Sequence, residues 1–178
     1  MLNKFIVILI CCSFSLGMAA DKPSEFLIGE TKFNVSVPSQ WQAAPGLYGA
    51  ELALLGEITD KKRPVIMIDR IPLDDFNFDK DELSDSYENF KLGRRKWFKK
   101  NFATEKEFFP YAVESWNHIK EVHKLSYSYE MLNKTYVENY YFFNCEGKMF
   151  NVHTLATVEQ EKKEKKTLKR ILNSLNCK

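Results

Sequence analysis

Apolar and polar positions alternate along several stretches of this chain, as they do in half-buried β-strands. Residues 32–37 read KFNVSV, so Phe33, Val35 and Val37 share one face. Pro38 ends this stretch, because proline lacks the N–H that a strand ladder needs. Apolar patterning predicts further strands at 49–58, 64–71, 111–119, 121–130, 135–144 and 148–158. For residues 49–58, a short helix is the alternative.

The last two of these strands form a hairpin whose turn is Cys145-Glu146-Gly147. Its first arm carries apolar side chains on both faces: Tyr136, Tyr140 and Phe142 on one, and Val137, Tyr141 and Phe143 on the other. We therefore expect both sides of this strand to be covered. In the preceding strand, Ser126 and Ser128 alternate with aromatic residues and are interpreted as outward-facing.

Helical spacing replaces the alternation in two segments. Residues 79–101 place Leu83, Tyr87, Phe90 and Trp97 on one stripe, and Asp79 with Glu82 resembles a capping box. Near the C-terminus a second charged helix has a narrow apolar stripe made of Leu168, Ile171, Leu172 and Leu175. Strands, a helix, more strands and a final helix predict an α+β domain with a mostly antiparallel β-sheet flanked by helices.

Residues 1–20 have the layout of a secretory signal peptide. Lys4 is their only charge, a nearly unbroken apolar run follows, and cleavage is expected near Ala19/Ala20. The alternative is an uncleaved membrane anchor, but the run is shorter than the roughly 20 apolar residues that a spanning helix needs. We expect a flexible leader at 21–30, a single domain at 31–178, and a periplasmic or secreted location.

Charge and composition restrict the class of partner. Without the signal peptide the chain has 25 basic and 24 acidic residues, since Lys4 leaves with it. A nearly neutral protein has no overall field that would gather nucleic acid, so we expect no nucleic-acid partner. Fourteen Phe, eight Tyr and three Trp indicate a well-filled core and exclude a disordered chain.

Two cysteines remain once Cys11 and Cys12 leave with the signal peptide: Cys145 and Cys177. Exported proteins meet oxidising conditions, so this pair is predicted to form a disulfide. The alternatives are a metal site and a redox centre. Neither C-x-x-C spacing nor a neighbouring histidine pair supports those alternatives. The predicted bond would hold the final helix against the sheet.

Several of these features resemble the PsbP/DcrB/Mog1-like family. The chain opens with a strand leading into a P-x-x-W turn, FNVSVPSQW at 33–41, and continues through F-x-x-D-E-L at 78–83. It closes with the hairpin YYFFNCEGKMFNV and the helix LKRILNSL. The resemblance covers nearly the whole exported chain. It implies an antiparallel sheet flanked by helices and an accessory or binding role without catalysis.

Residues that could carry chemistry are few. His118, His123 and His153 are the only histidines, and a zinc or copper site would need two or three of them to converge. The sequence contains no G-x-S-x-G elbow, Walker loop or dinucleotide fingerprint. Acidic residues at 74–82 are explained by a helix start, where negative charge is stabilised. We expect no cofactor, no metal and no catalytic residues; a hydrolase or metal enzyme with an unrecognised site is the alternative.

Basic residues gather in two clusters, one on each predicted helix. If both helices lay on one sheet face, they could form a joint surface for anionic lipid or cell-wall polymer. The alternative is a solvated helix face. The leading hypothesis is an exported, non-enzymatic envelope accessory or protein-binding module, whose partner is another envelope protein. The candidate anion-binding residues are Lys91, Arg94, Arg95, Lys96, Lys99 and Lys100 on the first helix, and Lys166, Lys169 and Arg170 on the second.

Overall fold

The computed structural model describes residues 22–71 and 80–177, with backbone only for Lys22 and residues 80–85. The predicted signal peptide at 1–20 therefore lies outside the described residues. The same is true of the predicted capping residues, Asp79 and Glu82, as far as their side chains are concerned.

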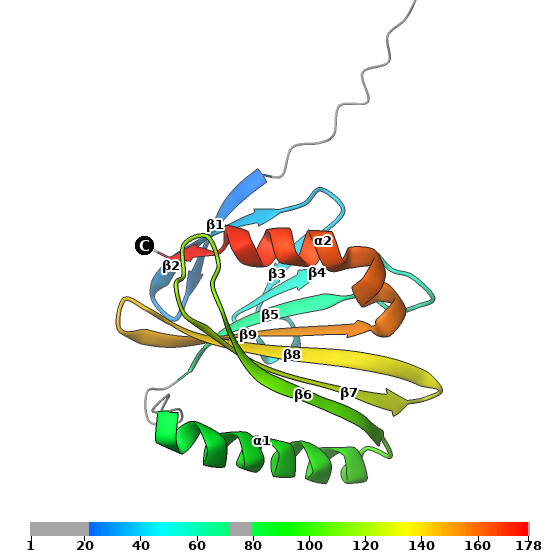
Figure 1. Ribbon diagram of the computed structural model, residues 1–178. Helices are drawn as coiled ribbons and strands as arrows, with labels where there is room; N and C mark the ends of the chain where they lie inside the picture. Colours follow the sequence, from blue (N-terminus) through cyan, green and yellow to red (C-terminus); the bar gives the residue numbers. More distant parts are fainter. Residues whose placement is uncertain (1–21, 72–79, 178) are drawn as a thin grey trace, which may run out of the picture.

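A seven-stranded antiparallel sheet forms the centre of the molecule (Figure 1). Its order is β3-β4-β5-β9-β8-β7-β6, and every neighbouring pair is antiparallel. The mostly antiparallel α+β architecture is thus confirmed. The strands are β3 (Gln42–Pro45), β4 (Leu52–Leu55), β5 (Val65–Ile71), β6 (Thr104–Glu114), β7 (Val122–Met131), β8 (Lys134–Cys145) and β9 (Lys148–Thr157).

A second, three-stranded sheet has the order β1-β2-β10. It consists of β1 (Lys22–Ile28), β2 (Thr31–Val37) and β10 (Asn176–Cys177). The expectation of a flexible leader at 21–30 is therefore wrong for β1, which pairs with β2 along its whole length. Strand β10 joins the other edge of β2, so the last described residues of the chain lie beside Phe33 and Asn34.

The two helices cover opposite faces of the large sheet (Figure 1). Helix α1 (Lys80–Lys100) packs below it against Tyr127 and Tyr140, and helix α2 (Val158–Ser174) lies above it with the small sheet. Strand β8 is covered on both sides, as its pattern predicted. Neither described helix is long and apolar enough to cross a membrane.

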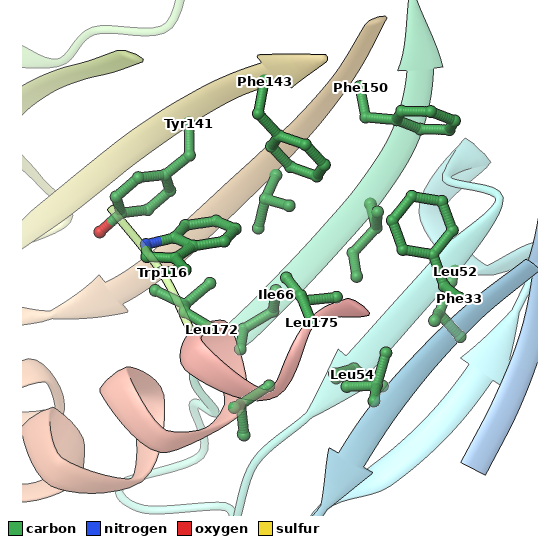
Figure 2. Packing of buried hydrophobic residues seen from close by; sticks show 14 of the residues in the cluster. Phe33, Leu52, Leu54, Ile66, Trp116, Tyr141, Phe143, Phe150, Leu172 and Leu175 are labelled. Carbon is green, nitrogen blue, oxygen red and sulfur yellow. The ribbon is translucent and has the colours of Figure 1, made fainter. Parts of the chain in front are cut away.

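The main core lies between the large sheet and the layer formed by α2 and the small sheet (Figure 2). Phe33 of β2 meets Phe150 and Phe143 edge to face, with ring centroids 4.8 and 6.4 Å apart. Leu172 of α2 and Leu175, the residue that follows α2, pack into the same core. Aromatic edges fit aromatic faces in such packing and add to the energy of area burial.

Two predicted elements differ from the observed ones. The strand expected at 111–119 is β6 and runs from Thr104 to Glu114, with irregular register between Glu105 and Glu107 and between Phe109 and Ala112. Pro110 lies inside the second irregularity and cannot donate to a ladder. Residues 49–58 contain a strand only at Leu52–Leu55, preceded by a 3₁₀ turn at Leu47–Gly49.

Helix α2 begins with a complete capping box. The Thr157 side chain accepts from the Gln160 N–H at 3.3 Å, and the Gln160 side chain accepts from the Thr157 N–H at 3.0 Å. Replacing Thr157 with alanine is expected to lower the free energy of unfolding by about 1 kcal/mol. Urea unfolding measures this change. Thr167→Ala, in the middle of the same helix, is the control and should shift stability much less; equal effects would contradict a capping role.

Candidate functional site

Short polar side chains form the floor of a cleft beneath α2. Ser126, Asn139 and Thr154 lie side by side on β7, β8 and β9, on the sheet face that α2 covers. Ser126 Oγ donates to Asn139 Oδ1 at 2.8 Å, and Asn139 Nδ2 donates to Thr154 Oγ1 at 3.0 Å. The expectation that Ser126 and Ser128 face outward is wrong, since both are buried. Because these side chains are short, they leave space between the sheet and α2, and this space is the cleft.

The apolar wall of this cleft comes from the β6–β7 loop and from α2. Trp116 is fixed by a tight turn in which its N–H donates to the Ile119 carbonyl at 2.8 Å. Its ring lies 5.4 Å from Tyr141 and 5.5 Å from Phe143, and Leu172 faces it from α2 (Figure 2). The cleft has a volume of about 370 Å³, which is within the size range of small-ligand sites.

Charged groups surround the entrance of this cleft. Lys124 pairs with Glu114 at 3.2 Å and lies over the Tyr141 ring. Burial, with the charges of Glu114 and Glu161, raises the pKa of Tyr141, so its hydroxyl keeps a proton at neutral pH and can donate. The complete set of lining residues is Glu114, Ser115, Trp116, Lys124, Asn139, Tyr141, Thr154, Glu161, Lys165, Leu168, Lys169, Leu172 and Asn173.

A second, more open depression adjoins the first and shares Lys169 and Asn173 with it. Its volume is about 430 Å³. Three of the predicted anion-binding residues meet here, which the helix pattern alone could not show. The lining residues are Ser36, Asn117, Lys166, Lys169, Arg170, Asn173 and Ser174. We call the two depressions together the α2 cleft. The first has an apolar wall and a hydrogen-bonding floor, and the second adds the basic side chains of Lys166, Lys169 and Arg170.

The predicted cations of α1 lie on the other side of the molecule (Figure 1). A joint cationic surface from both helices is therefore wrong. Arg94 turns inward, and its guanidinium donates to the hydroxyls of Tyr127 and Tyr140 at 3.4 and 3.2 Å. Arg95 binds Glu105 with two hydrogen bonds, and Lys91 pairs with Glu88. Three more cations, Lys96, Lys99 and Lys100, are exposed.

Sequence patterns did not single out Glu138, which is the centre of a buried polar cluster between α1 and the large sheet. Its Oε2 accepts from Tyr127 at 2.5 Å, from Tyr140 at 3.1 Å and from His153 Nε2 at 2.8 Å. Burial alone would raise the pKa of Glu138, but the hydrogen bond and charge of His153 and the Tyr127 hydroxyl outweigh it and lower that pKa. Glu138 is the only carboxylate of β8, a strand rich in aromatic residues, and this was the available signal. Each partner is satisfied within the cluster, as in a structural network.

The histidines do not converge. His118 lies in the β6–β7 loop, His123 contacts Tyr111 Oη at 2.5 Å and Glu121 at 3.2 Å, and His153 pairs with Glu138. Burial lowers the pKa of His123, and Glu121 opposes that effect. Among the described side chains, residues 23–71 and 86–177, no group of three His, Cys, Asp or Glu could hold a metal ion.

Cys145 and Cys177 are joined in a disulfide, with their Cα atoms 6.3 Å apart. Cys145 ends β8, and Cys177 lies in β10, opposite Phe33 of β2. The bond thus links the β8–β9 hairpin to the small sheet and to the end of α2. A pair of sulfurs engaged in this way is not available as nucleophile or metal ligand.

No protein-family model matches the sequence, and no curated protein matches it either. Among solved structures, the chain is similar to cyanobacterial PsbP (CyanoP) from Synechocystis, with 12% identity and a TM-score of 0.58 over 92% of this chain and 96% of that one. It is also similar to LpqN of Mycobacterium tuberculosis, described as involved in cell envelope biogenesis. That similarity has 12% identity and a TM-score of 0.53 over 88% of this chain and 90% of that one. The chain therefore has the PsbP-like α+β fold.

Proposed function

We propose that this protein is an exported, non-enzymatic binding module that holds a segment of an envelope protein in the α2 cleft. The observation that carries this proposal is the cleft itself, where an apolar wall at Trp116 continues into a depression lined by Lys166, Lys169 and Arg170. Such an arrangement suits an acidic segment that carries one large apolar side chain, since interfaces combine a buried anchor with complementary charge.

Export is supported by the signal-peptide pattern of residues 1–20 and by the disulfide, which persists in oxidising compartments. An envelope role is supported by the similarity to LpqN, which is described as involved in cell envelope biogenesis. A role without catalysis is supported by the disulfide and by Glu138, whose hydrogen-bond partners are all internal.

Site-specific crosslinking tests the proposal. A photo-crosslinking residue at Asn173, which lines both depressions, should capture one partner in the native envelope. Lys165→Glu/Lys169→Glu should reduce that capture roughly tenfold, because like charges would then face the partner's acids. The matched control is Lys96→Glu/Lys120→Glu, which makes the same charge change at two exposed lysines outside the cleft.

Equal capture by all three proteins would contradict the α2 cleft as the binding site. The non-enzymatic part has its own test, in which purified protein is incubated with the captured partner. An unchanged partner mass is expected, and a cleaved or modified partner would contradict that part of the proposal alone.

A further inference from the structure

Three exposed apolar side chains stand at one end of the large sheet, each in a different turn. Phe102 follows α1 and is 94% exposed, Leu132 lies in the β7–β8 turn and is 79% exposed, and Ile58 lies in the β4–β5 loop and is 59% exposed. Polar residues usually occupy such turns. Exposed apolar side chains that gather in this way mark interaction surfaces.

The strand register brings these turns together. Thr104 of β6 pairs with Glu130 of β7, so the turn at Phe102 adjoins the turn at Leu132. Thr59, Asp60, Asn133 and Lys134 line one depression, which joins the β4–β5 loop to the β7–β8 turn. In Figure 1 all three turns lie at the right-hand end of the sheet, away from the β8–β9 hairpin. We call this end the turn face.

At two of these positions, a large apolar side chain does not stabilise the fold. Phe102 and Leu132 both have left-handed backbone conformations, with φ of 55° and 52°. Glycine or asparagine adopts that conformation at lower cost than a bulky residue. Their side chains project into solvent, so they add little to the core. A large apolar group at such a position can contribute only when another surface covers it.

Lysines surround the turn face. Three of its carboxylates pair with lysines: Glu57 with Lys163 at 3.6 Å, Asp60 with Lys134 at 4.0 Å, and Glu130 with Lys106 at 2.6 Å. A fourth, Glu159, lines the same depression as Asp60. Four further lysines are exposed there, and none of them forms an ion pair with a carboxylate whose side chain the structure describes. They are Lys61, Lys62, Lys99 and Lys100. The turn face therefore combines apolar tips with surplus positive charge.

We infer that the turn face docks this protein on an anionic lipid surface. The tips at Ile58, Phe102 and Leu132 enter the boundary between headgroups and acyl chains, while the lysines meet the lipid phosphates. Separate apolar tips ringed by long cationic side chains suit this interface, where lysine stems can extend the charge back to the headgroups. A protein partner is the other class of occupant, but a cationic end with three protruding tips matches a deformable anionic surface better.

This inference does not depend on the proposed function. The α2 cleft faces the layer above the sheet, whereas the turn face lies at the sheet's end. Docking there would leave the α2 cleft open to a partner. Lys99 and Lys100 were predicted from the sequence as anion-binding residues of a helix surface; the structure places them beside Phe102 instead.

Vesicle co-sedimentation tests the inference with the protein lacking residues 1–20. Binding is expected to vesicles of equal parts phosphatidylglycerol and phosphatidylcholine, and to weaken as salt is added. Little binding is expected to phosphatidylcholine alone. Lys99→Gln/Lys100→Gln should weaken binding about 30-fold, from about 1 kcal/mol per lysine near an anionic surface. Phe102→Ser/Leu132→Ser should weaken it at least about tenfold, because the tips no longer enter the apolar region.

Two controls separate docking from general effects. Leu27→Ser removes an apolar side chain that is 68% exposed on β1, and Lys120→Gln removes an exposed cation of the β6–β7 loop; both should bind as the unchanged protein does. Phe102→Gly should lose vesicle binding while its unfolding midpoint stays the same or rises, since glycine tolerates this backbone. Equal binding by the Phe102→Ser/Leu132→Ser variant, or no preference for anionic vesicles, would overturn the inference and point to a protein partner at this end.

Discussion

Replacing Glu138 with alanine is expected to lower the free energy of unfolding by about 3–5 kcal/mol. The carboxylate is buried and accepts hydrogen bonds from Tyr127, Tyr140 and His153. Its removal leaves these donors without an acceptor in a site that water cannot readily enter, and an unsatisfied buried donor costs far more than an exposed one. Urea unfolding at neutral pH measures the loss.

The same residue predicts the acid side of the stability profile. The folded pKa of Glu138 is below its ordinary value of 4.5, so its contribution is fully present above that value. It is lost as the pH falls from about 4.5 through the lower folded pKa, because the folded state must then take up a proton that it disfavours. Glu138→Gln should be less stable than the unchanged protein at pH 7, and the difference should shrink in that acid range.

Glu130→Gln is the matched control, because Glu130 is half-exposed and pairs with Lys106 on the same sheet. It should change stability by less than about 1 kcal/mol, as exposed ion pairs usually do. If Glu138→Gln and Glu130→Gln had the same stability and the same acid profile, the buried cluster would not stabilise the fold.

Removal of the disulfide is the second large expected effect. Cys145 and Cys177 are 32 positions apart in the chain, and a crosslink that closes a loop of this length is expected to stabilise the fold by about 3.5 kcal/mol. The Cys145→Ser/Cys177→Ser variant should lose that amount in urea unfolding. The unchanged protein treated with reductant should match it, because both lack the crosslink.

Loss of this bond should also destabilise the end of α2 that borders the α2 cleft. Leu175 and Leu172 bury the end of α2, and the bond tethers the two residues that follow Leu175. Hydrogen exchange should therefore rise first at the last turn of α2 and at β10, before the centre of the large sheet opens. Intact mass two hydrogens below the fully reduced value is expected of the untreated protein. Two thiols that react freely before reduction would contradict the crosslink.

Local pattern was sufficient for most of the elements. The stripe at Tyr87, Phe90 and Trp97 identified α1, which ends at Lys100 as expected, and alternation identified β2, β7, β8 and β9. The apolar residues on both sides of β8 also predicted that both of its faces are covered. These signals are visible in one dimension because each side chain's direction follows from a helical or strand period alone.

The short strands were not predictable in the same way. β3 covers only Gln42–Pro45, β10 only Asn176–Cys177, and β1 contains Pro23 and several polar residues. Such segments become strands through backbone hydrogen bonds to a neighbour, and a sequence window does not contain that neighbour. Strand β6 was displaced for a related reason, since its irregular register interrupts the alternation on which its prediction rested.

The candidate sites, like the strands, were only partly predictable from the sequence. The sequence alone determined which residues carry charge, which two cysteines lie outside residues 1–20 and which faces of each element are apolar. Only the tertiary structure decided that α1 and α2 lie on opposite faces, that Lys166, Lys169 and Arg170 border a cleft, and that the turn at Phe102 adjoins the turn at Leu132. Periodicity specifies how a side chain is directed from its own backbone, whereas a site needs residues from distant segments. Strand pairing and helix packing set that second relation, through contacts between parts of the chain that no local window contains.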